Sequence, residues 1–276
     1  DDEGSSGYEG SINYRGPSAF SEPEVRAVQA FCEQHDFKLA LNYHSYGNLL
    51  IYPWGYNNTA TFDSITFDNY AELLTKRIGY VYGLGEETVG YRTNGDSDDW
   101  MYATQNIYAM TPEVGDPDDE FYPVPERIVP LCQGTLQMNL LAARLVNSLV
   151  QITDESPRYI KAGDNSLDLE FNRYGLLNDE VLVSFNALSP HILSVPEPIL
   201  LDMEKFEPHE RHLNFKVDNQ VPYGSSVKIE IVCQQGDYTY RDTLTKTRVD
   251  FTKIISDNGS NMDQWDNSLS QEWGLT

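Results

Sequence analysis

The sequence predicts two fold classes in succession: an α/β region in which helices flank a sheet, and then an all-β, immunoglobulin-like sandwich. Up to about Val150, segments of helical periodicity alternate with short apolar runs of strand length. From Pro157 onward, helical periodicity disappears, and short alternating segments are separated by turn residues. That spacing favours a sandwich of about 100 residues. We therefore expect an α/β domain at 1–153, a sandwich at 154–256, and a linker or the start of a further module at 257–276.

In the α/β region, caps, periodicity and apolar runs place each element. Ser21 is expected to cap a helix whose buried stripe is Val25, Val28 and Phe31. The further elements expected are strands at 37–43, 49–52 and 106–111, helices at 66–80 and 125–150, and a loop at 83–99.

The β-rich region contains the histidine pair His209 and His212, which follows Pro208. Because the pair lacks the helical frame of a zinc protease motif, we expect a surface turn there. The strands expected around it lie at 167–171, 181–185, 213–217 and 227–233.

Composition limits the classes of function. The chain has 276 residues, 40% of them apolar, which is enough for a sizeable core. Its formal net charge of -24 excludes nucleic acid as an expected partner, because phosphate binding needs clustered Lys and Arg. No apolar run approaches the roughly 20 residues of a membrane-spanning helix. The three cysteines do not make a disulfide framework.

Two side chains sit where strands are expected to end. His44 follows an apolar strand, and Glu113 follows another. In open α/β sheets the carboxyl ends of strands face the ligand crevice, where imidazole can ligate zinc and a carboxylate can act as a base. Taken singly, His44 could equally be a hydrogen-bonded core histidine and Glu113 a solvated loop acid. Tyr91 is one of 18 tyrosines and could be a packing ring.

The spacing of these residues is more specific than any one of them. The stretch 41–56 contains Asn-Tyr-His-Ser-Tyr-Gly followed by Tyr-Pro-Trp-Gly-Tyr. Tyr91 lies nine residues before Trp100, and Glu113 lies thirteen residues after it. With these motifs, residues 8–150 resemble the zinc metallocarboxypeptidases of the A and B type. The resemblance implies a mixed sheet flanked by helices.

The resemblance also implies roles for the matching residues. His44 would be a zinc ligand, and Glu113 would be the general base that deprotonates a zinc-bound water. Tyr91 would close over the C-terminal residue of a peptide or protein substrate. Ser45 and Tyr46 would line the adjoining subsites. The location implied is secreted, periplasmic or cell-surface.

Asp98 matches the position that forms the floor of the family's specificity pocket. An acid there would pair with a C-terminal Lys or Arg of the substrate. The alternative is that Asp96, Asp98 and Asp99 form a solvated acidic turn.

The sequence departs from the family in its metal ligands. No His-x-x-Glu occurs in this sequence, and the family's Asn-Arg pair and further arginine, which lie before the family's equivalent of Tyr14, are missing as well. Since catalytic zinc needs three protein ligands, this segment alone is expected to be inactive. Either an N-terminal half of a larger enzyme supplies the missing groups, or the chain is a non-catalytic homologue that binds peptides or surfaces.

Overall fold

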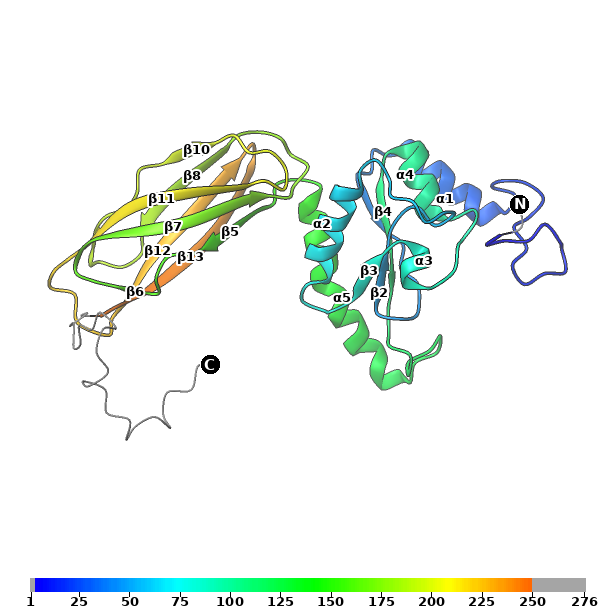
Figure 1. Ribbon diagram of the computed structural model, residues 1–276, viewed down its shortest axis with the longest axis horizontal. Helices are drawn as coiled ribbons and strands as arrows, with labels where there is room; N and C mark the ends of the chain where they lie inside the picture. The colour runs from blue at the N-terminus through cyan, green and yellow to red at the C-terminus, as the bar shows by residue number, and fades with distance from the viewer. Residues whose placement is uncertain (1–2, 250–276) are drawn as a thin grey trace, which may run out of the picture.

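The computed structural model describes residues 3–249, so the linker expected at 257–276 lies outside the described residues. Two parts follow one another along the long axis of the molecule (Figure 1). One part contains the helices and a four-stranded sheet, and the other contains a five-stranded and a four-stranded sheet. Within 3–249, no helix has the length and apolar character needed to cross a bilayer.

The sheet of the α/β part is mixed, as expected. Its strand order is β1-β4-β2-β3, so β1 and β3 are its edges. β4 pairs in parallel with β1 and antiparallel with β2, and β2 pairs in parallel with β3. The strands are β1 (Leu39–Leu41), β2 (Leu49–Ile51), β3 (Val81–Gly83) and β4 (Tyr108–Glu113).

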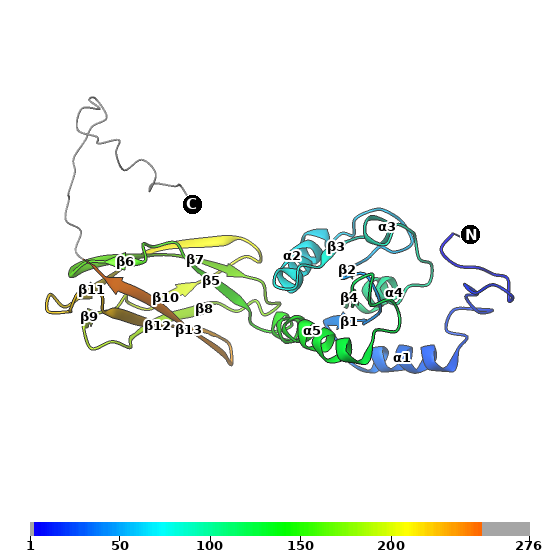
Figure 2. The ribbon, with the colours of Figure 1, turned by 90° about the horizontal axis from the view of Figure 1, so that it is seen from below.

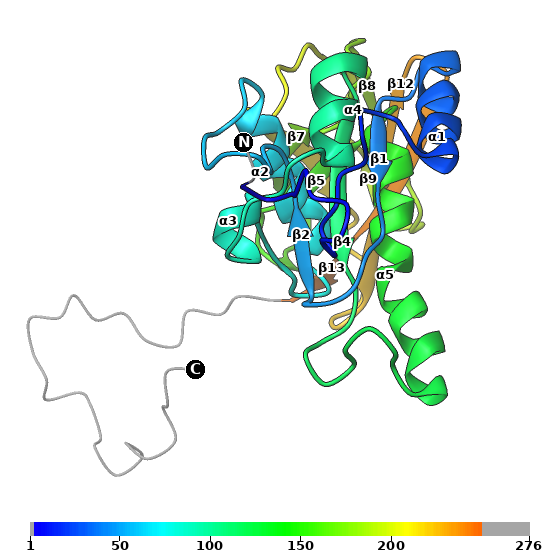
Figure 3. The ribbon, with the colours of Figure 1, turned by 90° about the vertical axis from the view of Figure 1, so that its right-hand side faces the viewer.

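Helices cover both faces of this sheet. In Figures 2 and 3, α1 and α5 lie on one side of the strands, and α2 and α3 lie on the other. Phe67, Tyr70 and Met138 are fully buried in the core between α2, α5 and the sheet. The helices are α1 (Pro23–Gln34), α2 (Ser64–Thr75), α3 (Gly85–Thr88), α4 (Ser97–Gln105) and α5 (Pro125–Leu145).

Helix α1 differs from its prediction at both its cap and its buried face. Its N-cap is Glu22, because Pro23 takes the first helical position. The Ser21 hydroxyl donates instead to the Glu22 carboxylate at 2.7 Å. The stripe expected to be buried is wrong: Val25, Val28 and Phe31 are 42%, 49% and 53% exposed. Cys32 is the residue of α1 that enters the core.

The loop expected at 83–99 contains two helices. Helix α3 is a single turn, and α4 starts inside the expected loop at Ser97. The Asp96 carboxylate caps α4 by accepting a hydrogen bond from the Asp98 amide at 2.7 Å.

The β-rich part consists of two sheets of order β10-β8-β12-β13-β6 and β5-β7-β11-β9 that share one hydrophobic core. Figure 2 shows them as two layers. The expected strands are present, and β11 is longer than expected. It includes His209 and His212, so the expectation of a turn there is wrong: β11 pairs with β7 along its whole length. The strands are β5 (Val150–Asp154), β6 (Tyr159–Ile160), β7 (Gly163–Arg173), β8 (Val181–Ala187), β9 (Ile192–Ser194), β10 (Ile199–Leu201), β11 (Pro208–Val217), β12 (Ser226–Gln235) and β13 (Tyr238–Arg248).

Candidate active site

His44 and Glu113 meet at the end of two neighbouring strands. After β1 the chain continues beside β4: the His44 amide donates to the Pro112 carbonyl, and the Val114 amide donates to the His44 carbonyl, both at 3.0 Å. His44 and Glu113 are consequently bridge partners. The Nδ1 atom of His44 lies 3.2 Å from Oε1 of Glu113. The two residues, 69 positions apart in sequence, thus form one polar pair.

The two side chains of this pair differ in their access to solvent. The His44 side chain is 67% exposed, whereas that of Glu113 is 9% exposed. Burial raises the pKa of Glu113 above its ordinary value, although the charge and hydrogen bond of His44 act in the opposite direction. A carboxylate with a raised pKa is a stronger base, and the exposed imidazole is open to a further ligand.

The loop that follows His44 is fastened to the loop that follows Glu113. The amides of Gly47 and Asn48 both donate to the Gly115 carbonyl, at 2.8 and 2.9 Å. The Tyr46 ring then packs edge-on against Phe121, with centroids 5.0 Å apart. Ser45 lies half-buried between His44 and Tyr46. Phe121 was not anticipated from the sequence, and its only signal there was a place on the loop downstream of Glu113.

Tyr91 is placed apart from this pair. Its side chain is 59% exposed and lines a hollow of about 690 Å³ together with Glu3, Glu86 and Arg92. Within residues 3–249, no hydrogen bond joins Tyr91 to His44 or Glu113. This conformation therefore does not join the phenol to the pair.

Asp98 is enclosed by the protein. It is 3% exposed, and its carboxylate accepts hydrogen bonds from Asn42 Nδ2 at 2.5 Å and from Thr111 Oγ1 at 2.8 Å. Burial and the negative charge of Asp96 raise the pKa of Asp98 to about 8. Asp98 thus ties the first turn of α4 to the residue after β1 and to β4. Sequence reasoning gave no sign of its partners Asn42 and Thr111.

The acidic segment around Asp98 is not a solvated turn, so that alternative is wrong. The Asp99 carboxylate accepts from the amides of Gly55 and Tyr56, at 2.9 and 3.2 Å. Its partial burial raises its pKa to about 6. Each acid of this segment holds a defined structural partner, because it belongs to the start of a packed helix.

The described residues offer an incomplete set of metal ligands. Within residues 3–249, no group of three or more His, Cys, Asp and Glu side chains could hold a metal ion. His44 fits one ligand position, since its imidazole is exposed beside a carboxylate. A zinc site of three protein ligands cannot be formed by these residues alone.

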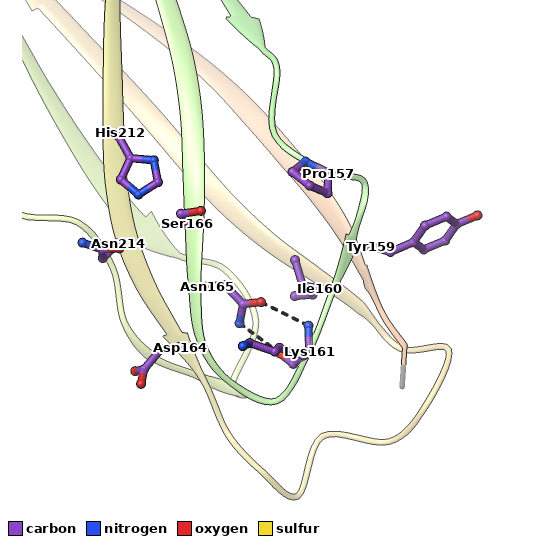
Figure 4. Close-up of a pocket in the computed structure, with 9 residues that line it drawn as sticks. All are labelled: Pro157, Tyr159, Ile160, Lys161, Asp164, Asn165, Ser166, His212 and Asn214. Carbon is purple, nitrogen blue, oxygen red and sulfur yellow. Dashed lines mark hydrogen bonds between the residues drawn. The ribbon is translucent and has the colours of Figure 1, made fainter. Parts of the chain in front are cut away.

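A cavity of about 380 Å³ on the β-rich part does not belong to this site (Figure 4). It is lined by polar side chains of β7 and β11, among them Ser166 and Asn214. Its histidine, His212, is already paired, with Nδ1 at 2.5 Å from Asp168 Oδ1. This region therefore supplies no free ligand to the pair at His44.

Comparison with known proteins finds similarity over the part of the chain that contains this site. A family model described as zinc carboxypeptidase matches residues 1–138, half of the chain. This chain belongs to the zinc carboxypeptidase family.

Individual relatives match the same part of the chain. Carboxypeptidase B of Bos taurus is 32% identical over 149 residues, which cover 51% of this chain and 34% of the relative. Zinc carboxypeptidase A 1 of Anopheles gambiae is 32% identical over 168 residues, covering 56% and 36%. A structure of bovine thrombin-activatable fibrinolysis inhibitor, in complex with tick carboxypeptidase inhibitor, has a TM-score of 0.46 at 29% identity and covers 51% of each chain. The chain spans about a third of the length of the curated relatives that it matches.

Proposed function

We propose that this chain contributes His44, Tyr91 and Glu113 to the catalytic centre of a secreted zinc carboxypeptidase that releases C-terminal residues from peptides. The observation that carries the proposal is the contact of His44 Nδ1 with the Glu113 carboxylate at 3.2 Å. It joins an imidazole suited to ligate a metal to a carboxylate suited to act as a base, across two strands. Family membership supports the choice of reaction.

Glu113 is the proposed base. It accepts a proton from the attacking water and then passes this proton to the leaving amine. Its burial supports this role, because a raised pKa makes the carboxylate a stronger acceptor. A zinc ion held in part by His44 would supply Lewis acidity, which lowers the pKa of a bound water and polarises the scissile carbonyl. Tyr91 would move from its exposed position to cover the substrate's C-terminal residue, and Ser45 and Tyr46 would line the neighbouring subsites.

The remaining zinc ligands are proposed to come from residues outside this chain. Three features of the α/β part support this idea. First, β1 is an edge strand among the described residues. Second, a groove of about 550 Å³ lined by Leu39, Leu41 and α5 runs along this edge. Third, α1 exposes an apolar stripe that includes Val28 and Phe31. Such edges and faces are normally covered by further structure.

A preference for Lys or Arg is proposed from Asp98. The buried carboxyl accepts a hydrogen bond from Asn42, which lies two residues before His44 in the chain. A cationic side chain arriving there would favour the ionised form and lower the pKa of Asp98 again. To reach it, the substrate must replace the hydrogen bonds from Asn42 and Thr111.

The β-rich part is proposed to be an immunoglobulin-like accessory domain of about 100 residues. Its two sheets and shared core support this architecture. The start expected at residue 154 falls inside the β-rich part of the structure, because β5 (Val150–Asp154) already pairs with β7.

A non-catalytic peptide-binding or surface-binding homologue is the second candidate. It is favoured by the incomplete ligand set within residues 3–249. The coding sequence upstream of Asp1 discriminates between the two candidates. A His-x-x-Glu followed by an Asn-Arg pair favours the enzyme, and a stretch without them favours the binder.

The test of the enzyme is a Glu113→Gln substitution in a polypeptide that contains this chain and a His-x-x-Glu segment. Removing the base should lower kcat for release of a C-terminal residue by about 10²- to 10⁴-fold. The matched control is Glu120→Gln, an exposed acid on the loop that follows Glu113, which should leave kcat unchanged. Unchanged turnover in Glu113→Gln would remove Glu113 from the mechanism.

A further inference from the structure

Two consecutive residues of the β-rich part reach into the core of the α/β part. The ammonium group of Lys205 lies 5.6 Å from the ring centroids of Tyr70 and Tyr108, and its Nζ donates to Thr66 Oγ1 at 3.2 Å. The ring of the next residue, Phe206, packs edge-on against Tyr70 with centroids 5.8 Å apart. Thr66 and Tyr70 belong to α2, and Tyr108 is the first residue of β4. In Figure 1, α2 lies on the side of the α/β part that faces the two sheets of the β-rich part.

The segment that carries these two residues is held rigidly by its own part. The guanidinium of Arg173 is buried, and it donates to the carbonyls of Met203 and Leu177 at 2.8 and 2.9 Å. The Phe206 amide donates to the Arg173 carbonyl at 2.9 Å, next to a bridge between Arg173 and Lys205. A buried guanidinium is costly unless its donors are satisfied, so these bonds fix the path of the segment.

The backbone at Phe206 is strained. Its φ of 68° lies in the left-handed region, which a bulky aromatic residue rarely adopts. Strain of this kind persists only where the surroundings fix it. The surroundings here are the rings of Tyr70 and Tyr174, each 5.8 Å from the Phe206 ring. The strained backbone is therefore coupled to a contact between the two parts.

The ammonium group of Lys205 lies over the faces of aromatic rings. Half-burial lowers the pKa of Lys205, and the negative charge of Asp63 acts in the opposite direction. Its ammonium group lies near three aromatic rings and one hydroxyl. Two of the rings and the hydroxyl are those described above, and the third ring is that of Phe206, whose centroid lies 4.9 Å from the ammonium group. A cation over aromatic faces is attracted by their negative potential, and more strongly where water is excluded.

We propose that Lys205 and Phe206 are positioning residues through which the β-rich part fixes helix α2 and strand β4. The contact fixes the first residue of β4, Tyr108, and Glu113 is the last residue of the same strand. Only this last link to catalysis rests on the proposed function. The contact of Lys205 and Phe206 with α2 and β4 is itself a property of the fold. Through this contact the β-rich part contributes side chains to the α/β core.

A second contact between the two parts lies at the end of α5 and must be left intact in any test. Arg144 lies over the Tyr240 ring at 4.9 Å, and the Tyr238 hydroxyl donates to Asn147 Oδ1 at 2.5 Å. This contact does not involve α2 or β4. Loss of Lys205 should therefore loosen those two elements without separating the two parts.

The experiment is amide hydrogen exchange of the whole 276-residue chain, followed by mass spectrometry of peptides from α1, α2 and β4. Lys205→Met removes the charge but keeps the length, and it should speed exchange in α2 and β4 by roughly 2- to 30-fold. Lys205→Arg, which can still stack on the rings, should restore slow exchange. The matched control is Lys228→Met, an exposed lysine on β12 of the same part, which should change nothing. Exchange in α1 serves as an internal reference.

A second variant separates the ring contact from the backbone strain. Glycine adopts a φ of 68° freely, so Phe206→Gly relieves strain while it removes the ring. If the ring holds α2, exchange in α2 speeds up despite the relief. Exchange in α2 and β4 that matches wild type in both Lys205→Met and Phe206→Gly would overturn the proposal. An equal acceleration in α1 would overturn it as well, because the effect would then be global. Neither zinc nor substrate is needed, so failure here is distinct from failure of the proposed enzyme.

Discussion

The pairing of a buried carboxylate with an exposed imidazole gives this site its chemical character. Glu113 keeps little contact with water, whereas His44 keeps one side open. Burial makes the carboxylate a better proton acceptor, and exposure leaves the imidazole able to bind a metal. The two properties are divided between neighbouring strands that run in parallel at this point.

Sequence spacing anticipated this pair but not the setting of Asp98. Both residues follow apolar runs, and the ends of such strands meet at one rim of a sheet, which is a geometric rule. The burial of Asp98 could not be anticipated, because it depends on Asn42 and Thr111, each more than ten residues away in sequence. Charge clusters in a sequence are usually solvated, and only packing decides otherwise.

The pKa of Asp98 leads to a prediction about stability. In the unfolded chain an Asp ionises near pH 3.9, whereas in the fold this carboxyl stays protonated up to about pH 8. Stability is therefore fully present below about pH 4 and decreases as the pH rises toward 8, because the unfolded state alone loses its proton. The side chain of the Asp98→Asn variant cannot ionise. The free energy of unfolding of this variant, taken relative to wild type, should therefore be higher at pH 7.5 than at pH 4.5 by on the order of 1–3 kcal/mol.

Chemical denaturation at the two pH values measures this difference. Asp118→Asn, at an exposed acid on the loop after Glu113, is the matched control and should show no such trend. A gap between Asp98→Asn and wild type that stays constant with pH would mean that Asp98 is ionised in the fold.

The same side chain gives a prediction about specificity. In an active polypeptide containing this chain, Asp98→Ile should lower kcat/KM for C-terminal Lys or Arg by about 10²-fold, because the pairing acid is gone. Cleavage after apolar residues should improve. Steady-state kinetics with matched peptides ending in Arg and Leu measures both, and an unchanged ratio of the two would remove Asp98 from the pocket.

Among the secondary-structure elements, helices α1, α3 and α4 depart from what the sequence indicates. Helix α4 was not predicted, because it begins in a segment rich in glycine and acids. Asp96 followed by acids in the first turn is nevertheless a signal for a helix start. Helix α1 has an apolar stripe that periodicity assigns to a core, yet in residues 3–249 the side chains of this stripe remain about half exposed. Periodicity reports which face is apolar, and it does not say whether a partner is present.

The unequal burial along α1 leads to a prediction about its packing. Val28→Gln should change the free energy of unfolding by less than about 0.5 kcal/mol, because the side chain is half exposed. Cys32→Ser, one turn later at a position where the helix is buried, should cost about 1–2 kcal/mol for a hydroxyl in an apolar site. Urea denaturation of both variants measures the contrast. A cost for Val28→Gln equal to that of Cys32→Ser would show that the stripe is buried in the protein in solution.

On the scale of the whole molecule, the succession of fold classes was readable from the sequence, and the contact between the parts was not. Along most of β7 and β12, buried residues alternate with more accessible ones, which is the pattern that a half-covered sheet imposes. Part of this contact is made by Lys205 and Phe206, which lie in a short connection without periodicity. Contacts of this kind bring together residues more than a hundred positions apart, so local sequence patterns do not report them.

The central claim is that His44 and Glu113 share one site that receives zinc. The most direct test is a zinc titration of the 276-residue chain followed by amide NMR. We expect chemical-shift changes confined to residues 42–48 and 111–115. The affinity for zinc should be weak, because His44 is a single imidazole ligand. The changes should be lost in His44→Ala. Changes centred on His209 and His212 instead, with 44 and 113 silent, would contradict it.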